Sequence, residues 1–178
     1  MRWPPPCTRD RILATSLALF NDEGLASVST HRMAAELGIS PGNLHYHFKS
    51  KRLVVAGLFR RFEELLSACM DVAAAVDALG DLWLWLHLAF ENINAYRFVY
   101  LDADHLLDEC PELEARASAD GVQPARREQL CSGLRDAGVI EAGDKKVEML
   151  ALQIDFATTC WFSFKRLAPK RSLGAHAH

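Results

Sequence analysis

Apolar residues recur at helical spacing in short runs along the first third of the chain. The first run follows Thr8, a good N-cap residue, and stops at Gly24, which is typical of a helix end. The second follows Ser29, another N-cap type, and stops at Gly38. The third opens at Pro41, since proline suits the first position of a helix. This pattern predicts three short helices, with a tight turn between the second and the third.

A longer apolar run opens at Lys51 and reaches toward residues 73–75, which predicts a fourth helix that links the two halves of the chain. Later apolar runs also have the helical period, and none alternates as a half-buried strand does. They cover residues 81–95, 96–109, 111–137 and 144–167. We therefore expect an all-α protein, in which a three-helix N-terminal domain is joined by a long fourth helix to a second helical domain.

The two halves of the chain differ in charge. Residues 1–65 hold nine Lys and Arg against six Asp and Glu, whereas residues 66–178 hold eleven against seventeen. A basic N-terminal segment followed by an acidic remainder indicates that the N-terminal domain binds a polyanion.

Composition and motifs exclude several classes of protein. Five scattered cysteines without a C-x-x-C pair argue against a disulfide framework or a thiolate zinc site, and favour the reducing cytoplasm. No apolar stretch approaches the ~20 residues of a membrane span, and no basic-then-apolar leader opens the chain. Because no nucleophile elbow, phosphate loop or H-E-x-x-H motif occurs, we expect neither an enzyme nor a cofactor.

The turn Gly38-Ile39-Ser40 predicts a helix-turn-helix, in which the second helix enters the major groove of DNA. Leu44 and Phe48 lie four positions apart and mark the buried face of that helix. Helix N-termini at Ser29 and at Ser40 add backbone N–H groups that suit phosphates. The face opposite Leu44 carries side chains that can bond to bases or phosphates, namely Asn43, His45, Tyr46 and His47. A small helical core with a merely solvated polar face would show a similar pattern.

In this segment the chain resembles the TetR-like, or tetracycline-repressor-like, family of transcription regulators. Residues 9–58 follow the order of the family's helix-turn-helix, including the run Gly42-Asn43-Leu44-His45-Tyr46-His47-Phe48-Lys49-Ser50-Lys51. The resemblance implies a DNA-binding domain and, behind it, an effector-binding and dimerisation domain. We expect the former at residues 8–52, the latter at 53–168, and flexible ends at 1–7 and 169–178.

The resemblance also implies which side chains face DNA. Besides Ser29 at the helix N-terminus, they are Thr30, His31, Ser40, Gly42, Asn43, His45, Tyr46 and His47. Lys51 would neutralise a phosphate at the start of the fourth helix. We expect bases to be contacted by Asn43, His45 and Tyr46, although Tyr46 and His47 would equally suit phosphates.

Two residues depart from the family pattern. His45 stands where the family usually has tyrosine, which could change the sequence preference or add a proton-dependent contact. Arg32 stands where an acidic residue would close a capping box with Ser29. This change weakens the cap by ~0.5 kcal/mol and adds a positive charge near the phosphates.

In the family, the last two helices form a dimer. The last predicted helix of this chain carries large apolar residues around much of its circumference, which favours one stripe that packs against a second copy over a purely internal core. These residues are Met149, Leu152, Ile154, Phe156, Trp161, Phe162 and Phe164.

The middle of the chain is rich in aromatic residues and is our candidate for the effector pocket, although aromatic stripes also occur in ordinary cores. The candidate lining residues are Trp83, Leu86, Phe90, Tyr100 and Phe156. Asp102, His105 and Glu109 share one helical face, which is compatible with a cation site or with a solvated acidic surface. Solvated faces of this kind are common, so we expect no metal.

These observations predict a cytoplasmic, ligand-responsive repressor that binds a near-palindromic DNA operator as a homodimer. Its recognition helices would lie about 34–36 Å apart, and its effector would be a small apolar or aromatic molecule. Activation of transcription would use the same DNA contacts. The alternative is a helical sensor or binding protein that has lost specific DNA binding, as the small positive charge of residues 1–65 allows. The sequence does not indicate the operator, the regulated genes or the identity of the effector.

Overall fold

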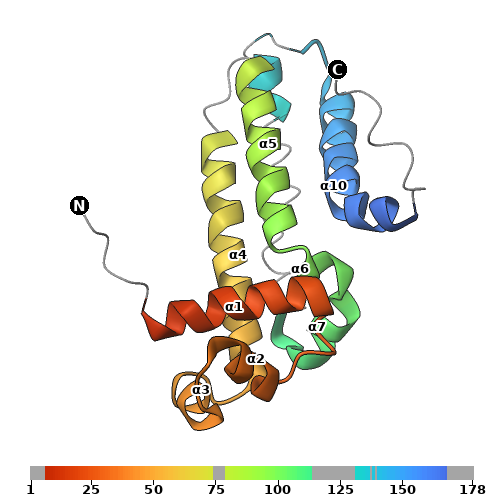
Figure 1. The fold of residues 1–178 in the computed structure, drawn as a ribbon. Helices are drawn as coiled ribbons and strands as arrows, with labels where there is room; N and C mark the ends of the chain where they lie inside the picture. Colours follow the sequence, from red (N-terminus) through yellow and green to blue (C-terminus); the bar gives the residue numbers. More distant parts are fainter. Residues whose placement is uncertain (1–6, 74–78, 114–130, 137, 139, 168–178) are drawn as a thin grey trace, which may run out of the picture. The chain divides into compact units, whose positions relative to one another are not determined.

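The computed structural model describes residues 7–73, 79–113, 131–136, 138 and 140–167 (Figure 1). Every regular element in these residues is a helix, which confirms the all-α prediction. In chain order the helices whose bounds fall within the described residues are α1 (Thr8–Glu23), α2 (Thr30–Leu37), α3 (Pro41–His47), α4 (Lys51–Ala73), α5 (Leu79–Ala95), α6 (Phe98–Leu101), α7 (Ala103–Glu109) and α10 (Asp144–Leu167). Within the described residues, no helix combines the length and apolar character that crossing a membrane requires. The expected flexible ends lie almost wholly outside the described residues, as does most of the run 111–137.

The ends of α1 follow the sequence pattern with one difference. Cys7, with φ −63° and ψ 158°, is the N-cap, and Thr8 is already helical, so the expectation that Thr8 caps this helix is wrong. At the other end the helix stops at Gly24, whose φ of +83° is a value that side chains disfavour.

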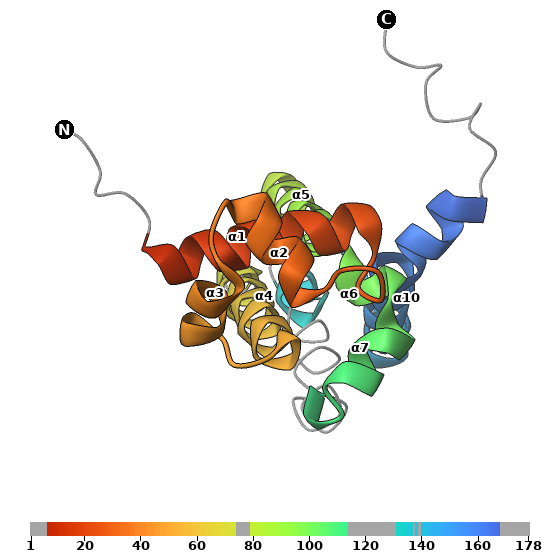
Figure 2. The same cartoon turned by 60° about the horizontal axis from the view of Figure 1, so that its bottom comes forward.

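The helix-turn-helix forms through the caps that the sequence predicts. Ser29 Oγ accepts a hydrogen bond from the backbone N–H of Arg32 at 3.1 Å, and Ser40 Oγ accepts one from Asn43 at 3.2 Å. Gly38 ends α2 in the left-handed region, with φ +65°. These local interactions set the turn between α2 and α3, and α2 packs against both α1 and α3 (Figure 2).

The first of two compact units combines residues 1–69 with residues 94–120. Its apolar core therefore includes side chains from outside the predicted domain 8–52. Phe98 is fully buried, with its ring centroid 5.5 Å from that of Phe20, and the ring of Tyr96 lies 5.4 Å from that of Phe62. Other core residues from the later segment are Leu106, Cys110 and Leu113. The segment 94–113 thus completes the core on which the helix-turn-helix rests.

The run 96–109 forms two short helices instead of one. Asp102, with φ −121° and ψ 34°, leaves the helical conformation and separates α6 from α7. Its carboxylate accepts the backbone N–H of Leu25 at 2.7 Å, a contact that a continuous helix pattern does not reveal.

The second compact unit comprises residues 70–93 and 121–178, and its described parts are mainly α5, up to Ile93, and α10. Cys131 packs there with Val147 and Ala151 of α10. The outer stripe of α10 is exposed, with Met149 at 59%, Leu152 at 57% and Phe156 at 70%. The side chains of Trp161, Phe162 and Phe164 lie outside the described residues.

Candidate nucleic-acid interface

Helix α3 has one buried and one exposed face. Leu44 is 1% exposed and Phe48, just after the helix, is 2% exposed, because both insert into the core of the first unit. Asn43, His45 and Tyr46 are exposed, and Tyr46 reaches 77%. The predicted polar face of α3 is therefore accessible, as contact with a DNA groove requires.

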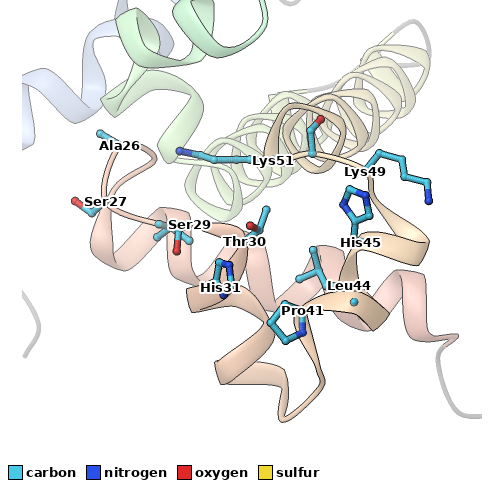
Figure 3. A pocket seen from close by; sticks show the side chains of 13 residues that line it. Ala26, Ser27, Ser29, Thr30, His31, Pro41, Leu44, His45, Lys49 and Lys51 are labelled. Atoms are coloured by element: carbon cyan, nitrogen blue, oxygen red, sulfur yellow. The ribbon is translucent and has the colours of Figure 1, made fainter.

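An open cleft brings the N-terminus of α2 together with α3 and the residues that follow it (Figure 3). Its volume is about 730 Å³. Predicted DNA contacts from both helices meet here, with His31 on α2 and His45 on α3. The lining residues are Ala26, Ser27, Val28, Ser29, Thr30, His31, Pro41, Gly42, Leu44, His45, Lys49, Ser50 and Lys51.

The chemistry of this cleft suits an anion. Among the described residues that line it there is no Asp or Glu, whereas there are two lysines and two histidines. The N-terminus of α2 adds the positive end of a helix dipole. Asn43 and Tyr46 lie on α3 but are not among the residues that line the cleft. The hydroxyl group of Ser40 accepts a hydrogen bond from the backbone N–H of Asn43.

Lys49 and Lys51 enter the cleft differently. Lys49 is exposed, and sequence reasoning did not single it out, although its place directly after Phe48 was a usable signal. Lys51 is only 19% exposed, and its Nζ donates to the carbonyl oxygen of Leu25 at 2.7 Å and lies 3.9 Å from Glu109 Oε2. In Figure 3 the Lys51 side chain extends toward the connection at Ala26. The phosphate contact predicted for Lys51 stays a prediction, and the structure gives this ammonium two protein partners.

The positive charge of Arg32, which the sequence predicts near the DNA phosphates, is paired with carboxylates of the protein. Its guanidinium donates to Glu36 at 2.7 Å and to Glu23 at 2.6 Å. These two hydrogen bonds raise the pKa of Arg32 further above its ordinary value. Arg32 therefore braces α2 against the end of α1, and two carboxylates offset its charge.

The candidate effector residues occupy different environments. Trp83 is 72% exposed on α5, while Leu86 and Phe90 on the same helix are partly buried. Tyr100 packs on the core of the first unit, with its ring 6.0 Å from that of Phe62. Phe156 lines an apolar groove of about 290 Å³ with Met149, Leu152 and Gln153. The assignment of these residues to one effector pocket stays a prediction.

The two carboxylates of the candidate cation site at Asp102, His105 and Glu109 have protein partners in this structure. Asp102 accepts a hydrogen bond from Leu25, and Glu109 pairs with Lys51, while His105 is exposed. Across the described part of the chain, no group of three or more His, Cys, Asp or Glu side chains is arranged to hold a metal ion.

Comparison with protein families matches almost the whole chain. Residues 12–62 match the family described as bacterial regulatory proteins, tetR family, and residues 61–177 match the one described as bacterial transcriptional repressor. Among curated proteins, the HTH-type transcriptional repressor KstR2 of Mycolicibacterium smegmatis is 29% identical over 115 residues, which are 62% of this chain and 56% of KstR2. The tetracycline repressor protein class C of Escherichia coli is 38% identical over 50 residues, which are 28% of this chain and 23% of that repressor. The matched segments thus span about half or less of the length of these two relatives.

Solved structures extend the likeness to the fold. A TetR-family transcriptional regulator from Marinobacter aquaeolei VT8 superposes with a TM-score of 0.83 at 32% identity, over 92% of this chain and 82% of that one. The ketosteroid transcriptional regulator KstR2 of Mycobacterium tuberculosis gives a TM-score of 0.69 at 22% identity, over 94% of this chain and 86% of that one. The second comparison concerns the fold alone.

Proposed function

The chain belongs to the TetR family of bacterial transcriptional repressors, and on this premise we propose that it represses transcription by binding a near-palindromic DNA operator as a homodimer. A small-molecule effector would control this binding. The relatives named above are regulators, so we propose regulation and not catalysis as the activity.

One observation carries the DNA-binding proposal: His45 and the first residues of α3 line one open cleft with the N-terminus of α2, and the described lining of this cleft contains no carboxylate. A groove of DNA presents base edges flanked by phosphates. Asn43, with a side-chain donor and acceptor, suits the edge of adenine, whereas Lys49 and the backbone at Thr30 suit phosphates. His45 and Tyr46 are also exposed on α3 and would complete the base contacts.

The homodimer is supported by α10. Met149, Leu152 and Phe156 are spaced by three and four residues, share one stripe and are all more than half exposed. Such a stripe is unusual on the surface of a monomer and suits a symmetric helix pair. A dimer would place two copies of α3 about 34–36 Å apart, one turn of DNA.

The effector is supported by Trp85, which neighbours the candidate lining residues on α5. Trp85 is 2% exposed, and its indole N–H has no hydrogen-bond partner among the described residues. A ligand with an acceptor atom beside this part of α5 would give this N–H a partner. We therefore assign to the effector an apolar or aromatic body that carries at least one hydrogen-bond acceptor.

Selection from a random pool of duplex DNA tests the proposal. The wild-type chain should enrich a near-palindromic sequence and bind it with a strong dependence on salt. Asn43→Ala should lower discrimination at one base pair of each half-site by ~1–3 kcal/mol, measured by fluorescence anisotropy with single-base variants. Asn94→Ala, an exposed asparagine at the end of α5, is the matched control and should leave discrimination unchanged. A pool that stays unenriched would contradict the proposal and favour a sensor without specific DNA binding.

A further inference from the structure

Both polar groups of the Leu25 backbone are held by charged side chains. The N–H of Leu25 donates to Asp102 Oδ2 at 2.7 Å, and its carbonyl oxygen accepts from Lys51 Nζ at 2.7 Å. The Leu25 side chain is 1% exposed and belongs to the apolar core. Hydrogen bonds of this kind, with one ionised partner, are roughly twice as strong as neutral ones. We call Leu25, Asp102 and Lys51 the Leu25 clamp.

The clamp holds the connection between α1 and α2. Leu25 directly follows Gly24, the C-cap of α1, and lies four residues before Ser29, the N-cap of α2. The connection is short, so the position of Leu25 restricts where the chain enters α2 at Thr30 and His31, which line the DNA-facing cleft.

The two charged members of the clamp are themselves held in place. Lys51 pairs with Glu109 of α7, with Nζ and Oε2 3.9 Å apart. Asp102 lies in the turn between α6 and α7, and this segment is bound to the end of α1 by Asn21. The Asn21 side chain donates to the carbonyl oxygen of Ala95 at 2.8 Å and accepts the N–H of Phe98 at 3.0 Å. The clamp thus rests on two helices distant in sequence from the helix-turn-helix.

We propose that Asp102 and Lys51 are positioning residues for DNA recognition, which hold the Leu25 backbone from both sides and thereby set the N-terminus of α2 without themselves touching DNA. The proposal rests on the DNA binding proposed above. It differs from the sequence-based expectation for Lys51, which assigns that ammonium to a phosphate.

Asp102→Ala removes the acceptor for the Leu25 N–H. We expect faster hydrogen exchange of the Leu25 amide and of the first amides of α2, and an affinity for the selected duplex that is about tenfold weaker. Asp102→Asn keeps an acceptor oxygen and should restore most of the affinity. Asp108→Ala removes an exposed carboxylate of the adjacent helix α7, and hence the same charge, and should change neither quantity.

The salt dependence of binding separates positioning from phosphate contact. A lysine that contacts a phosphate contributes ~0.9 to the slope of log affinity against log salt. Lys51→Met should therefore weaken binding without changing this slope, whereas Lys49→Met should lower the slope by ~0.9. A lower slope for Lys51→Met would overturn its role in positioning and make it a phosphate ligand.

The remaining outcomes are also decisive. Equal exchange and equal affinity for Asp102→Ala and the wild-type chain would overturn the proposal. If Asp102→Ala unfolds, as a melting curve would show, Lys51→Met carries the test, because it removes the other hydrogen bond to Leu25 and is judged by its affinity and its salt dependence. If the wild-type chain selects no duplex, the proposed function fails, while exchange at Leu25 and at the start of α2 still decides whether the clamp holds the connection.

Discussion

The two compact units of the chain differ in the apolar surface that they leave exposed. In the first unit the large aromatic residues of the core are at most 8% exposed, and Phe20, Phe48 and Phe98 are at most 2% exposed. In the second unit Trp83 and Phe156 are exposed by 72% and 70%, although both are as apolar as the core residues. The first unit therefore completes its core within one chain, whereas the second presents surface that suits a second copy or a ligand.

The largest expected effect tests whether the segment 94–113 is part of the first unit's core. Phe98→Ala removes a fully buried ring that packs on Phe20, and should lower the free energy of unfolding by ~3–5 kcal/mol. Urea unfolding followed by circular dichroism measures this change. Leu107→Ala, in the same segment but 36% exposed, is the control and should cost about 1 kcal/mol or less. Comparable losses for the two variants would show that the core does not depend on this segment.

A smaller effect is expected in the second unit. Phe156→Ala removes a ring that is 70% exposed in the single chain, so it should scarcely change the stability of the folded monomer. If the ring lies in a dimer interface, the dissociation constant of the dimer should rise about tenfold, as sedimentation equilibrium would detect. Gln153→Ala, which alters a polar neighbour in the same groove, is the control. An unchanged dissociation constant would place the interface elsewhere.

The smallest effect concerns an exposed ion pair of the first unit. Arg52 donates to both carboxylate oxygens of Glu112, and these hydrogen bonds hold the pKa of Glu112 below its ordinary value. Because the folded-state pKa is lowered, the pair stabilises the folded chain above the ordinary glutamate pKa, and this contribution is lost as the pH falls through the lowered value.

An NMR titration of the Glu112 carboxyl group measures this shift. Arg52→Gln should return the pKa of Glu112 toward its ordinary value and reduce the loss of stability below about pH 4.3. Arg60→Gln is the matched control, because Arg60 pairs with Glu64 and not with Glu112. A Glu112 pKa that is the same in wild type and Arg52→Gln would show that the pair is not formed in solution.

The sequence predicts local structure well where the determinants are local. The bounds of α2 and α3 follow from Ser29, Gly38 and Ser40, since each acts on residues at most a few positions away. The exposed face of α3 follows equally from the spacing of Leu44 and Phe48.

The spacing of apolar and polar residues does not predict contacts between residues that are distant in the sequence. Asp102 bonds to Leu25 across 77 positions, and at Asp102 the backbone interrupts a run that the sequence pattern predicts to be one helix. Lys51 illustrates the same limit, because its place after α3 indicates a phosphate contact, and only the fold shows the Leu25 carbonyl beside it. Whether the candidate effector residues line one pocket also depends on contacts between distant residues, which aromatic content alone does not predict.

Because Cys110 is buried, the reaction of its thiol with a reagent would report when the first unit opens. Cys110 is fully buried in the core, and burial raises the pKa of its thiol to about 11. The reactive thiolate is therefore scarce at neutral pH, and alkylating reagents reach this sulfur only when the segment that carries it separates from the helix-turn-helix. Cys7, which is exposed, would react at once. The interval between these two reactions, followed by mass spectrometry, would time how often the DNA-binding unit comes apart.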